Sequence, residues 1–160
     1  MKMAIFVALV IAAGAVPRAQ SPARESAPGA AFKSAAEIKT ALDALGAVSK
    51  TGAAVTVYPG ITVRRRSTSD EAQFAIVHPF SIEIYQITDG TATLVTGGSL
   101  TLPLADSTDP DVVRSDAITA GERRQVAKGD VIVLPPGTPH WFSDISGTIT
   151  YLEARVPVKP

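Results

Sequence analysis

From about residue 53 onward, apolar and polar residues alternate in short runs separated by turn residues. Alternation with a period of two is typical of β-strands that bury one face. Many short strands, evenly spaced and without helices between them, predict an all-β sandwich or barrel. The predicted strands are residues 53–58, 61–67, 72–78, 82–88, 91–96, 122–127, 130–134, 140–145 and 148–156. The turns are Pro59-Gly60, Asp89-Gly90, Gly97-Gly98, Lys128-Gly129-Asp130 and Ser146-Gly147.

Two segments depart from this alternation. Residues 99–121 are polar, with an acidic middle, and predict a long loop between two halves of the barrel. Residues 34–46 have the apolar spacing of a short amphipathic helix. Ser34 and Glu37 stand at the spacing of a capping box, and Gly46 is a natural helix end. The apolar face expected to pack on the barrel consists of Ile38, Ala41, Leu42 and Leu45.

The N-terminal residues indicate export. Lys2 gives a positive start, residues 4–16 are almost wholly apolar, and Ala15, Ala19 and Ala23 are candidate last residues before cleavage. The apolar run is too short for a permanent membrane helix. We therefore predict a signal peptide at residues 1–20, in preference to a retained anchor. The mature protein is then expected to be periplasmic or secreted, with no stable membrane span.

Composition narrows the class further. The Pro-, Ala- and Ser-rich residues 21–33 predict a flexible linker, and residues 34–160 a single domain. The 160 residues include no cysteine, which excludes disulfides, zinc-thiolate sites and thiol nucleophiles. Lys and Arg together number 15, as do Asp and Glu, so there is no basic excess to favour a nucleic-acid partner.

Two stretches place side chains that can bind metal beside stiff turns, whose Pro and Gly residues fix the direction of the side chain. The first begins at His78 and includes Glu83. The second ends at His140. Glu83, Tyr85 and Ile87 share one face of a predicted strand. If that face looks inward, His78 and Glu83 can converge, and His140 can reach them from the other sheet.

These stretches resemble the paired motifs of the cupin superfamily over about residues 60–156. The second motif is matched by Gly129, Pro135, Gly137 and His140, although Asp144 stands where the family often has Asn. The first is matched by His78, Glu83 and Gly90, but Ile76 replaces the leading histidine of the pair. The resemblance implies a cupin-type jelly-roll barrel with one short N-terminal helix.

The resemblance also implies a metal site. The usual cupin site has three His and one Glu, of which His78, Glu83 and His140 remain. Two imidazoles and one carboxylate are the ligand set associated with Fe(II), and the set could also hold Mn, Zn, Ni or Co. His78 and His140 are the two histidines of the chain, and both stand at motif positions. We prefer metal binding to the alternative of hydrogen-bonded interior histidines.

Neighbouring residues leave alternatives open. Glu83 could instead form a buried ion pair with one residue of the arginine run 64–66, because a buried carboxylate needs a partner. We interpret the run itself as a solvated strand edge, in preference to an anchor for a substrate carboxylate. Ile76, Tyr85 and Phe142 lie beside the proposed ligands and are predicted to line the pocket.

Several functions fit this pattern. One is a metal-dependent enzyme acting on a small molecule, with oxygenase- or isomerase-like chemistry. Another is a metal-free barrel that binds a small ligand, which Ile76 favours because it makes the pocket less polar. A third is an envelope protein whose barrel serves as a scaffold. Cupins commonly pair, so a homodimer through residues 34–46 or 53–58 is also expected.

Overall fold

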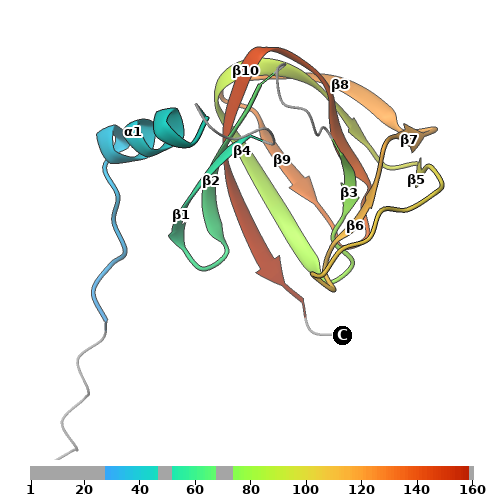
Figure 1. Ribbon diagram of the computed structural model, residues 1–160, viewed down its shortest axis with the longest axis horizontal. Coiled ribbons are helices and arrows are strands. Elements are labelled where there is room, and N and C mark those ends of the chain that lie inside the picture. Colours follow the sequence, from blue (N-terminus) through green and yellow to red (C-terminus); the bar gives the residue numbers. More distant parts are fainter. Residues whose placement is uncertain (1–27, 47–51, 68–73, 159–160) are drawn as a thin grey trace, which may run out of the picture. The chain divides into compact units, whose positions relative to one another are not determined.

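The computed structural model describes residues 28–46, 52–67 and 74–158. Two compact units divide the chain, residues 1–30 and 31–160, and the described helix and strands belong to the second. That unit is an all-β jelly-roll barrel with one short N-terminal helix, as predicted (Figure 1). Its elements are α1 (Ala35–Gly46), β1 (Ala53–Tyr58), β2 (Ile61–Ser67), β3 (Ala75–Val77), β4 (Ser81–Thr96), β5 (Ser99–Leu100), β6 (Val113–Ser115), β7 (Ile118–Thr119), β8 (Glu122–Ala127), β9 (Val131–Leu134) and β10 (His140–Pro157).

One eight-stranded antiparallel sheet forms the barrel. Its order is β1-β2-β10-β3-β6, and β4 pairs with β10, β8 and β9. We expected His140 to reach the site from a second sheet, but β10 belongs to the same sheet as β3 and β4. His140 lies opposite Ile76 on one side and opposite Thr96 on the other. The curvature of this single sheet therefore brings the predicted ligands together.

The long strands β4 and β10 correct one prediction. Strand ends were expected at Asp89-Gly90 and Ser146-Gly147, but β4 runs through the first pair and β10 through the second. The two strands pair with each other, and their register shifts just after Ser146. Gly90 has a φ of 81°, and a Cβ on it would collide with the carbonyl oxygen of Thr148. These glycines therefore bend continuous strands, as β-bulges do.

The predicted loop 99–121 is also more structured than expected. It contains β5 and β7, which pair with each other, and β6, which pairs with β3. Arg114 of β6 lies opposite Ile76 of β3. The strands are so short that sequence alternation does not reveal them. As a result, the segment forms part of the wall beside the predicted site.

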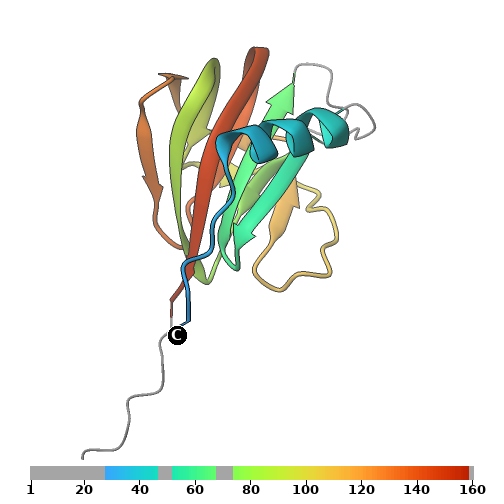
Figure 2. The same ribbon diagram turned by 90° about the vertical axis from the view of Figure 1, so that its left-hand side faces the viewer.

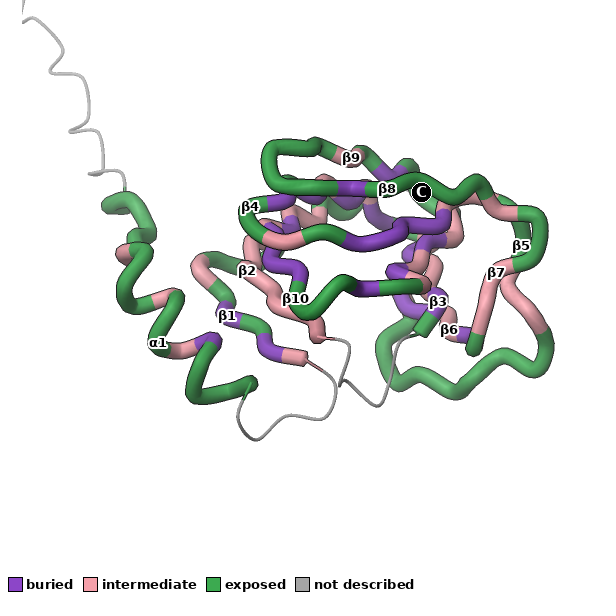
Figure 3. The backbone as a smooth tube through the Cα atoms, turned by 90° about the horizontal axis from the view of Figure 1, so that it is seen from above, coloured by how far each residue is buried: buried purple, intermediate pink, exposed green. Residues whose placement is uncertain are grey.

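In the first half of β4, buried residues alternate with less buried ones, so that Glu83, Tyr85 and Ile87 share the inner face, as predicted. In Figure 3, buried stretches gather within the sheet, whereas α1 is mostly exposed. The largest cluster of buried hydrophobic side chains, which we call the apolar core, lies between the strands of the barrel. It consists of Tyr85, Ile87, Ala92, Leu94, Val126, Leu134, Phe142, Ile145, Ile149 and Tyr151.

The helix α1 begins with the predicted capping box. The backbone N–H of Ser34 donates to Glu37 Oε2 at 2.7 Å, and that of Glu37 donates to Ser34 Oγ at 3.2 Å. The helix lies beside β1 (Figure 2). Leu42 is buried in a cluster with Ala53 and Val55 of β1. Leu45, expected on the same face, is 41% exposed, because the packed face centres on Leu42.

The predicted signal peptide and most of the predicted linker lie outside the described residues. The boundaries at residues 20 and 33 therefore stay predictions. Within the described ranges, no helix combines the length and the apolar character that crossing a membrane requires.

Candidate metal centre

The three predicted ligands meet inside the barrel. His78 directly follows β3, Glu83 lies near the start of β4, and His140 opens β10. His78 Nε2 lies 3.4 Å from Glu83 Oε1, and His140 Nε2 lies 3.1 Å from Glu83 Oε2. One ligand atom of each residue lies within 4.8 Å of the others, and all three side chains are buried. This group could hold a divalent metal ion.

Backbone carbonyls hold the outer nitrogen of each imidazole ring. His78 Nδ1 lies 2.5 Å from the carbonyl oxygen of Asp111, and His140 Nδ1 lies 3.1 Å from that of Thr138. A carbonyl oxygen only accepts hydrogen bonds, so each Nδ1 must carry the hydrogen. In a neutral ring, Nε2 then has a free lone pair, and both lone pairs face the interior. Metal-binding histidines are commonly oriented by such contacts.

The inward-facing acceptors need a positive charge among them. Tyr85 supplies one hydroxyl hydrogen, and its oxygen lies 3.1 Å from His140 Nε2 and 3.4 Å from Glu83 Oε2. That single hydrogen does not lie between His140 Nε2 and Glu83 Oε2. The close approach of these two atoms therefore sets a lone pair against a negatively charged oxygen, which is unfavourable. The contact becomes favourable if His140 gains a second proton or if a cation lies between the two atoms. A metal ion is one such cation.

Arg155 already provides a cation on the other side of Glu83. Its Nη2 lies 3.0 Å from His78 Nε2 and 3.2 Å from Glu83 Oε1, and its Nε lies 3.3 Å from the same oxygen. Arg155 stands directly opposite Glu83 in the pairing of β10 with β4. The guanidinium therefore contacts two of the atoms that would bind a metal.

The surroundings set the protonation states of two candidate ligands. Burial alone would raise the pKa of Glu83, but its electrostatic contacts with His140, His78 and Arg155 hold that pKa below its ordinary value of 4.5. Burial lowers the pKa of His78, and the charge of Glu83 offsets this only in part. At neutral pH, Glu83 is therefore ionised and His78 neutral, as metal ligation requires.

Tyr85 joins the centre to the apolar core. Burial raises the pKa of its hydroxyl well above the ordinary value, so the hydroxyl keeps its hydrogen as a donor. Its ring lies 4.8 Å from that of Tyr151 and 6.2 Å from that of Phe142, measured between centroids. One side chain thus packs in the apolar core and presents a polar group to the ligands.

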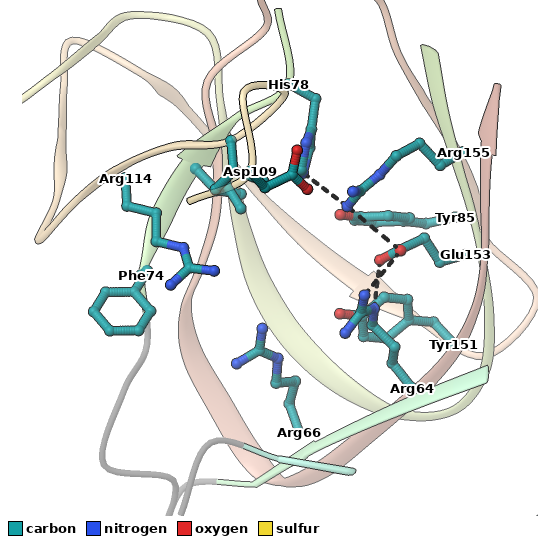
Figure 4. A pocket seen from close by; sticks show the side chains of 12 residues that line it. Arg64, Arg66, Phe74, His78, Tyr85, Asp109, Arg114, Tyr151, Glu153 and Arg155 are labelled. Carbon is teal, nitrogen blue, oxygen red and sulfur yellow. Dashed lines mark hydrogen bonds and ion pairs between the residues drawn. The ribbon is translucent and has the colours of Figure 1, made fainter. Parts of the chain in front are cut away.

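A pocket of about 350 Å³ borders the centre at His78 (Figure 4). Two of the predicted pocket residues, Ile76 and Tyr85, lie in its wall. The third, Phe142, lines a second pocket of about 30 Å³ that also contacts His140. The remaining wall of the larger pocket consists of Arg64, Arg66, Phe74, Asp109, Val112, Arg114, Tyr151, Glu153 and Arg155.

The arginine run 64–66 is not a solvated edge, because β2 lies between β1 and β10. Successive residues of a strand face opposite sides. Arg64 faces the pocket and donates to Glu153 at 2.7 and 3.1 Å, whereas Arg65 pairs with Asp43 of α1 at 2.6 Å. The alternative of a buried ion pair between Glu83 and an arginine is found, but the arginine is Arg155 and not a residue of this run.

Sequence reasoning missed several residues of this region. Asp111 holds His78 through its carbonyl oxygen, and its carboxylate accepts hydrogen bonds from Ser81 Oγ at 2.6 Å and the backbone N–H of Phe80 at 2.7 Å. It lies in the segment that was predicted to be a loop, where no periodicity marks it. Arg155 did leave a signal in the sequence. Glu153 and Arg155 are two charged residues at alternate positions of the last predicted strand, so both face the same side of it.

Comparisons with known proteins bear on the backbone alone. Neither a scan against protein-family models nor a search of curated proteins finds a match. Among solved structures, the cysteine peptidase Peruvianin-I from Thevetia peruviana latex is 17% identical, with a TM-score of 0.40, over 69% of this chain and 63% of its own. FeII HppE is 11% identical, with a TM-score of 0.38, over 66% of this chain and 50% of its own. The hydroquinone 1,2-dioxygenase PnpCD, in complex with Cd²⁺ and 4-hydroxybenzonitrile, is 16% identical, with a TM-score of 0.45, over 86% of this chain and 83% of its own.

This chain therefore spans less than two thirds of the length of Peruvianin-I and of HppE. At identities this low, a likeness in backbone says nothing about a shared reaction. What the protein does must be argued from its own side chains.

Proposed function

We propose that the protein binds one divalent metal ion through His78, Glu83 and His140, and uses it to bind or transform a small molecule in the adjoining pocket. The observation that carries this proposal is the convergence of two Nε2 lone pairs on an ionised carboxylate, with both Nδ1 atoms tied to backbone carbonyls. Acceptors that converge in a buried space need a cation to offset their desolvation.

The ligand set narrows the chemistry. Two imidazoles and one carboxylate suit Fe(II) with open positions for oxygen or substrate, and Mn, Zn, Ni and Co also accept them. A metal bound there would supply a Lewis acid or an oxygen-binding centre, the basis of oxygenase- or isomerase-like reactions. Glu83 would be a ligand and so no free general base. Tyr85 would donate its hydroxyl hydrogen beside the ligands.

Elemental analysis after supplementation with Fe(II), Mn, Zn, Ni or Co tests whether the protein binds a metal ion. Wild-type protein is expected to retain about one ion per chain after dialysis. His78→Ala, His140→Ala and Glu83→Gln should each lower metal affinity by more than about a hundredfold, because loss of a residue that only orients a ligand already costs about tenfold to a hundredfold. An oxygen-uptake screen on small phenols, keto acids and sugars then tests the reaction class.

Glu122→Gln is the matched control, since Glu122 is an exposed carboxylate of β8. It should leave the metal content unchanged. Wild-type protein that holds no stoichiometric metal after supplementation, or ligand variants that bind metal as tightly as the control, would exclude the site.

A metal-free binding protein is the second candidate, and Arg155 favours it. The guanidinium satisfies His78 Nε2 and Glu83 Oε1 without an ion. A ligand that binds only the folded state raises the melting temperature. If a small ligand raises it equally in chelator-treated and metal-loaded protein, simple binding is supported. A shift that requires metal contradicts this candidate.

We further propose that the protein acts in the periplasm or outside the cell. The support is the positive start and apolar run within residues 1–20. N-terminal sequencing of protein recovered from these compartments should show a mature start near residues 16–24. A chain that retains Met1 and stays inside the cell contradicts export.

A further inference from the structure

Arg155 contacts the candidate metal centre at an atom that can serve only one partner. The Nη2 atom of Arg155 lies 3.0 Å from His78 Nε2, which accepts this hydrogen bond because the Nδ1 atom of the ring carries the hydrogen. The Nε2 atom of a neutral imidazole has a single lone pair. A metal ion bound by His78 needs the same lone pair. The hydrogen bond from Arg155 and a bond from His78 to a metal ion therefore exclude each other.

The contact of Arg155 with Glu83 also opposes an incoming cation. Arg155 Nη2 and Nε lie 3.2 and 3.3 Å from Glu83 Oε1. A guanidinium is always protonated in proteins, so its positive charge repels a metal ion at this distance. A metal ion can therefore bind the predicted ligands only if the guanidinium moves away from His78 and Glu83.

A second buried carboxylate, that of Glu153, lies next to Arg155. The two residues are two positions apart on β10, so their side chains face the same side of the strand, and both line the pocket. Figure 4 shows the guanidinium between His78 and Glu153. Glu153 Oε1 lies 3.7 Å from Arg155 Nη2, less than about 1 Å beyond a hydrogen bond. Rotation of the Arg155 side chain is therefore enough to bring the two groups together.

Glu153 can accept this additional partner. It is 6% exposed and binds Arg64, which donates to Oε2 at 2.7 Å and to Oε1 at 3.1 Å. An ionised carboxylate has about four lone-pair positions, so these two hydrogen bonds leave room for a second guanidinium. A buried charge needs a partner of opposite sign. Glu153 therefore offers Arg155 such a partner once Arg155 leaves Glu83.

We propose that Glu153 is a positioning residue, which holds the Arg155 guanidinium away from the ligands when the candidate centre binds a divalent metal ion. This inference concerns the proposed metal site and rests on it. Metal binding and the position of Arg155 are then coupled, so a partner that stabilises Arg155 at Glu153 strengthens metal binding. Because both residues line the pocket, its wall also differs between the metal-free and the metal-bound protein.

A double-mutant cycle tests the proposal, with metal affinity measured by competition with a chelator. Zn(II) is the probe, because it has no redox chemistry. Glu153→Gln removes the charge of the second partner and should weaken Zn(II) binding about tenfold. In the Arg155→Met background, the same substitution should have little effect, since no guanidinium is left to hold. Glu153→Asp, which keeps the charge, should fall between Gln and wild type.

The two backgrounds separate this role from a direct attraction between Glu153 and the ion, which would act equally in both. Glu122→Gln, at an exposed carboxylate of β8, is the matched control. Equal weakening by Glu153→Gln in the two backgrounds overturns the proposal, as does an affinity equal to that of the control. Circular dichroism and melting curves verify that each variant is folded, and Glu153→Asp gives the comparison if Glu153→Gln is not.

Urea denaturation of chelator-treated protein tests the two positions of Arg155 without a metal. Glu83→Gln removes the partner at the centre, so Arg155 should then depend on Glu153. Glu153→Gln should therefore lower the free energy of unfolding more in the Glu83→Gln background than in wild type. Such coupling in a protein that binds no Zn(II) removes the metal site and keeps the two positions of Arg155. Zn(II) binding without coupling in either cycle keeps the metal site and removes the role of Glu153.

Discussion

The interior of the barrel has two parts that share strands but differ in chemistry. One is the polar cluster of His78, Glu83, His140 and Arg155, and the other is the apolar core. Within β4, Glu83 belongs to the first and Ile87 to the second, yet each is 1% exposed. Their degree of burial is therefore the same, and only their partners differ.

The two parts depend on different kinds of interaction. Apolar side chains gain free energy from burial itself, at roughly 25 cal/mol per Å² of surface, and need no particular partner. A buried carboxylate loses its hydration and must recover that free energy from charges and hydrogen bonds. Glu83 does so through the guanidinium of Arg155 and the hydroxyl of Tyr85. The core therefore secures the fold, while the polar cluster keeps chemical groups available for binding.

The largest effect on stability is expected in the apolar core. Ile149→Ala removes most of a side chain that is 0% exposed and leaves a cavity, which should lower the free energy of unfolding by about 2–5 kcal/mol. Urea denaturation measures this change. Val133→Ala, on an exposed position of β9, should change it by less than about 0.5 kcal/mol. If Ile149→Ala also abolishes metal binding while the protein is folded, the two parts are not independent.

A smaller effect, on binding, is expected at Arg155. Arg155→Met removes the cation that contacts His78 Nε2 and Glu83 Oε1, so it should raise metal affinity about tenfold, which is about 1.4 kcal/mol. Competition with a chelator of known affinity measures it. Arg155→Lys, which keeps the charge, should stay closer to wild type. Weaker binding in the Met variant would show that Arg155 supports the ligands and does not compete for them.

The smallest effect is expected from pH, in metal-free protein. The pKa of His78 is lowered by burial from 6.5, and that of Glu83 lies below 4.5 in the folded state. In both cases the unfolded chain binds the proton first. Each group therefore stabilises the fold above its ordinary pKa, and this contribution is lost as the pH falls through the folded value.

Urea denaturation at stepped pH in a chelator measures this dependence. Stability should fall as the pH drops below 6.5, the ordinary value for histidine, and again below 4.5, the ordinary value for Glu83. In His78→Gln, the decrease in stability that begins below pH 6.5 should be smaller. If that decrease is unchanged in the variant, His78 does not titrate as its burial implies.

The sequence predicted what depends on local signals. Strands 53–58, 61–67 and 122–127 coincide with β1, β2 and β8, because turn residues enclose a clear alternation. The positions of His78, Glu83 and His140 followed from turn chemistry and motif spacing. Their meeting inside the barrel required only that alternate residues of β4 face inward, which they do.

The rest depended on pairing between distant strands. Arg155 meets Glu83 because β10 lies beside β4 in a particular register, which no local pattern specifies. Arg114 enters the pocket because the short strand β6 pairs with β3. The glycines of Asp89-Gly90 and Ser146-Gly147 look like turn residues in sequence, and only the paired strands show them to be bends.

The pairing of β4 with β10 also bears on how the centre can move. Glu83 and Arg155 lie on the same rung of a ladder that runs from Ser81 and Pro157 to Thr96 and His140. The backbone at these residues cannot separate without breaking the hydrogen bonds that hold the barrel together, so this part of the molecule opens as one cooperative unit. Any adjustment to an incoming ion or ligand must then come from side-chain rotation, and Arg155 is the long side chain best placed to rotate.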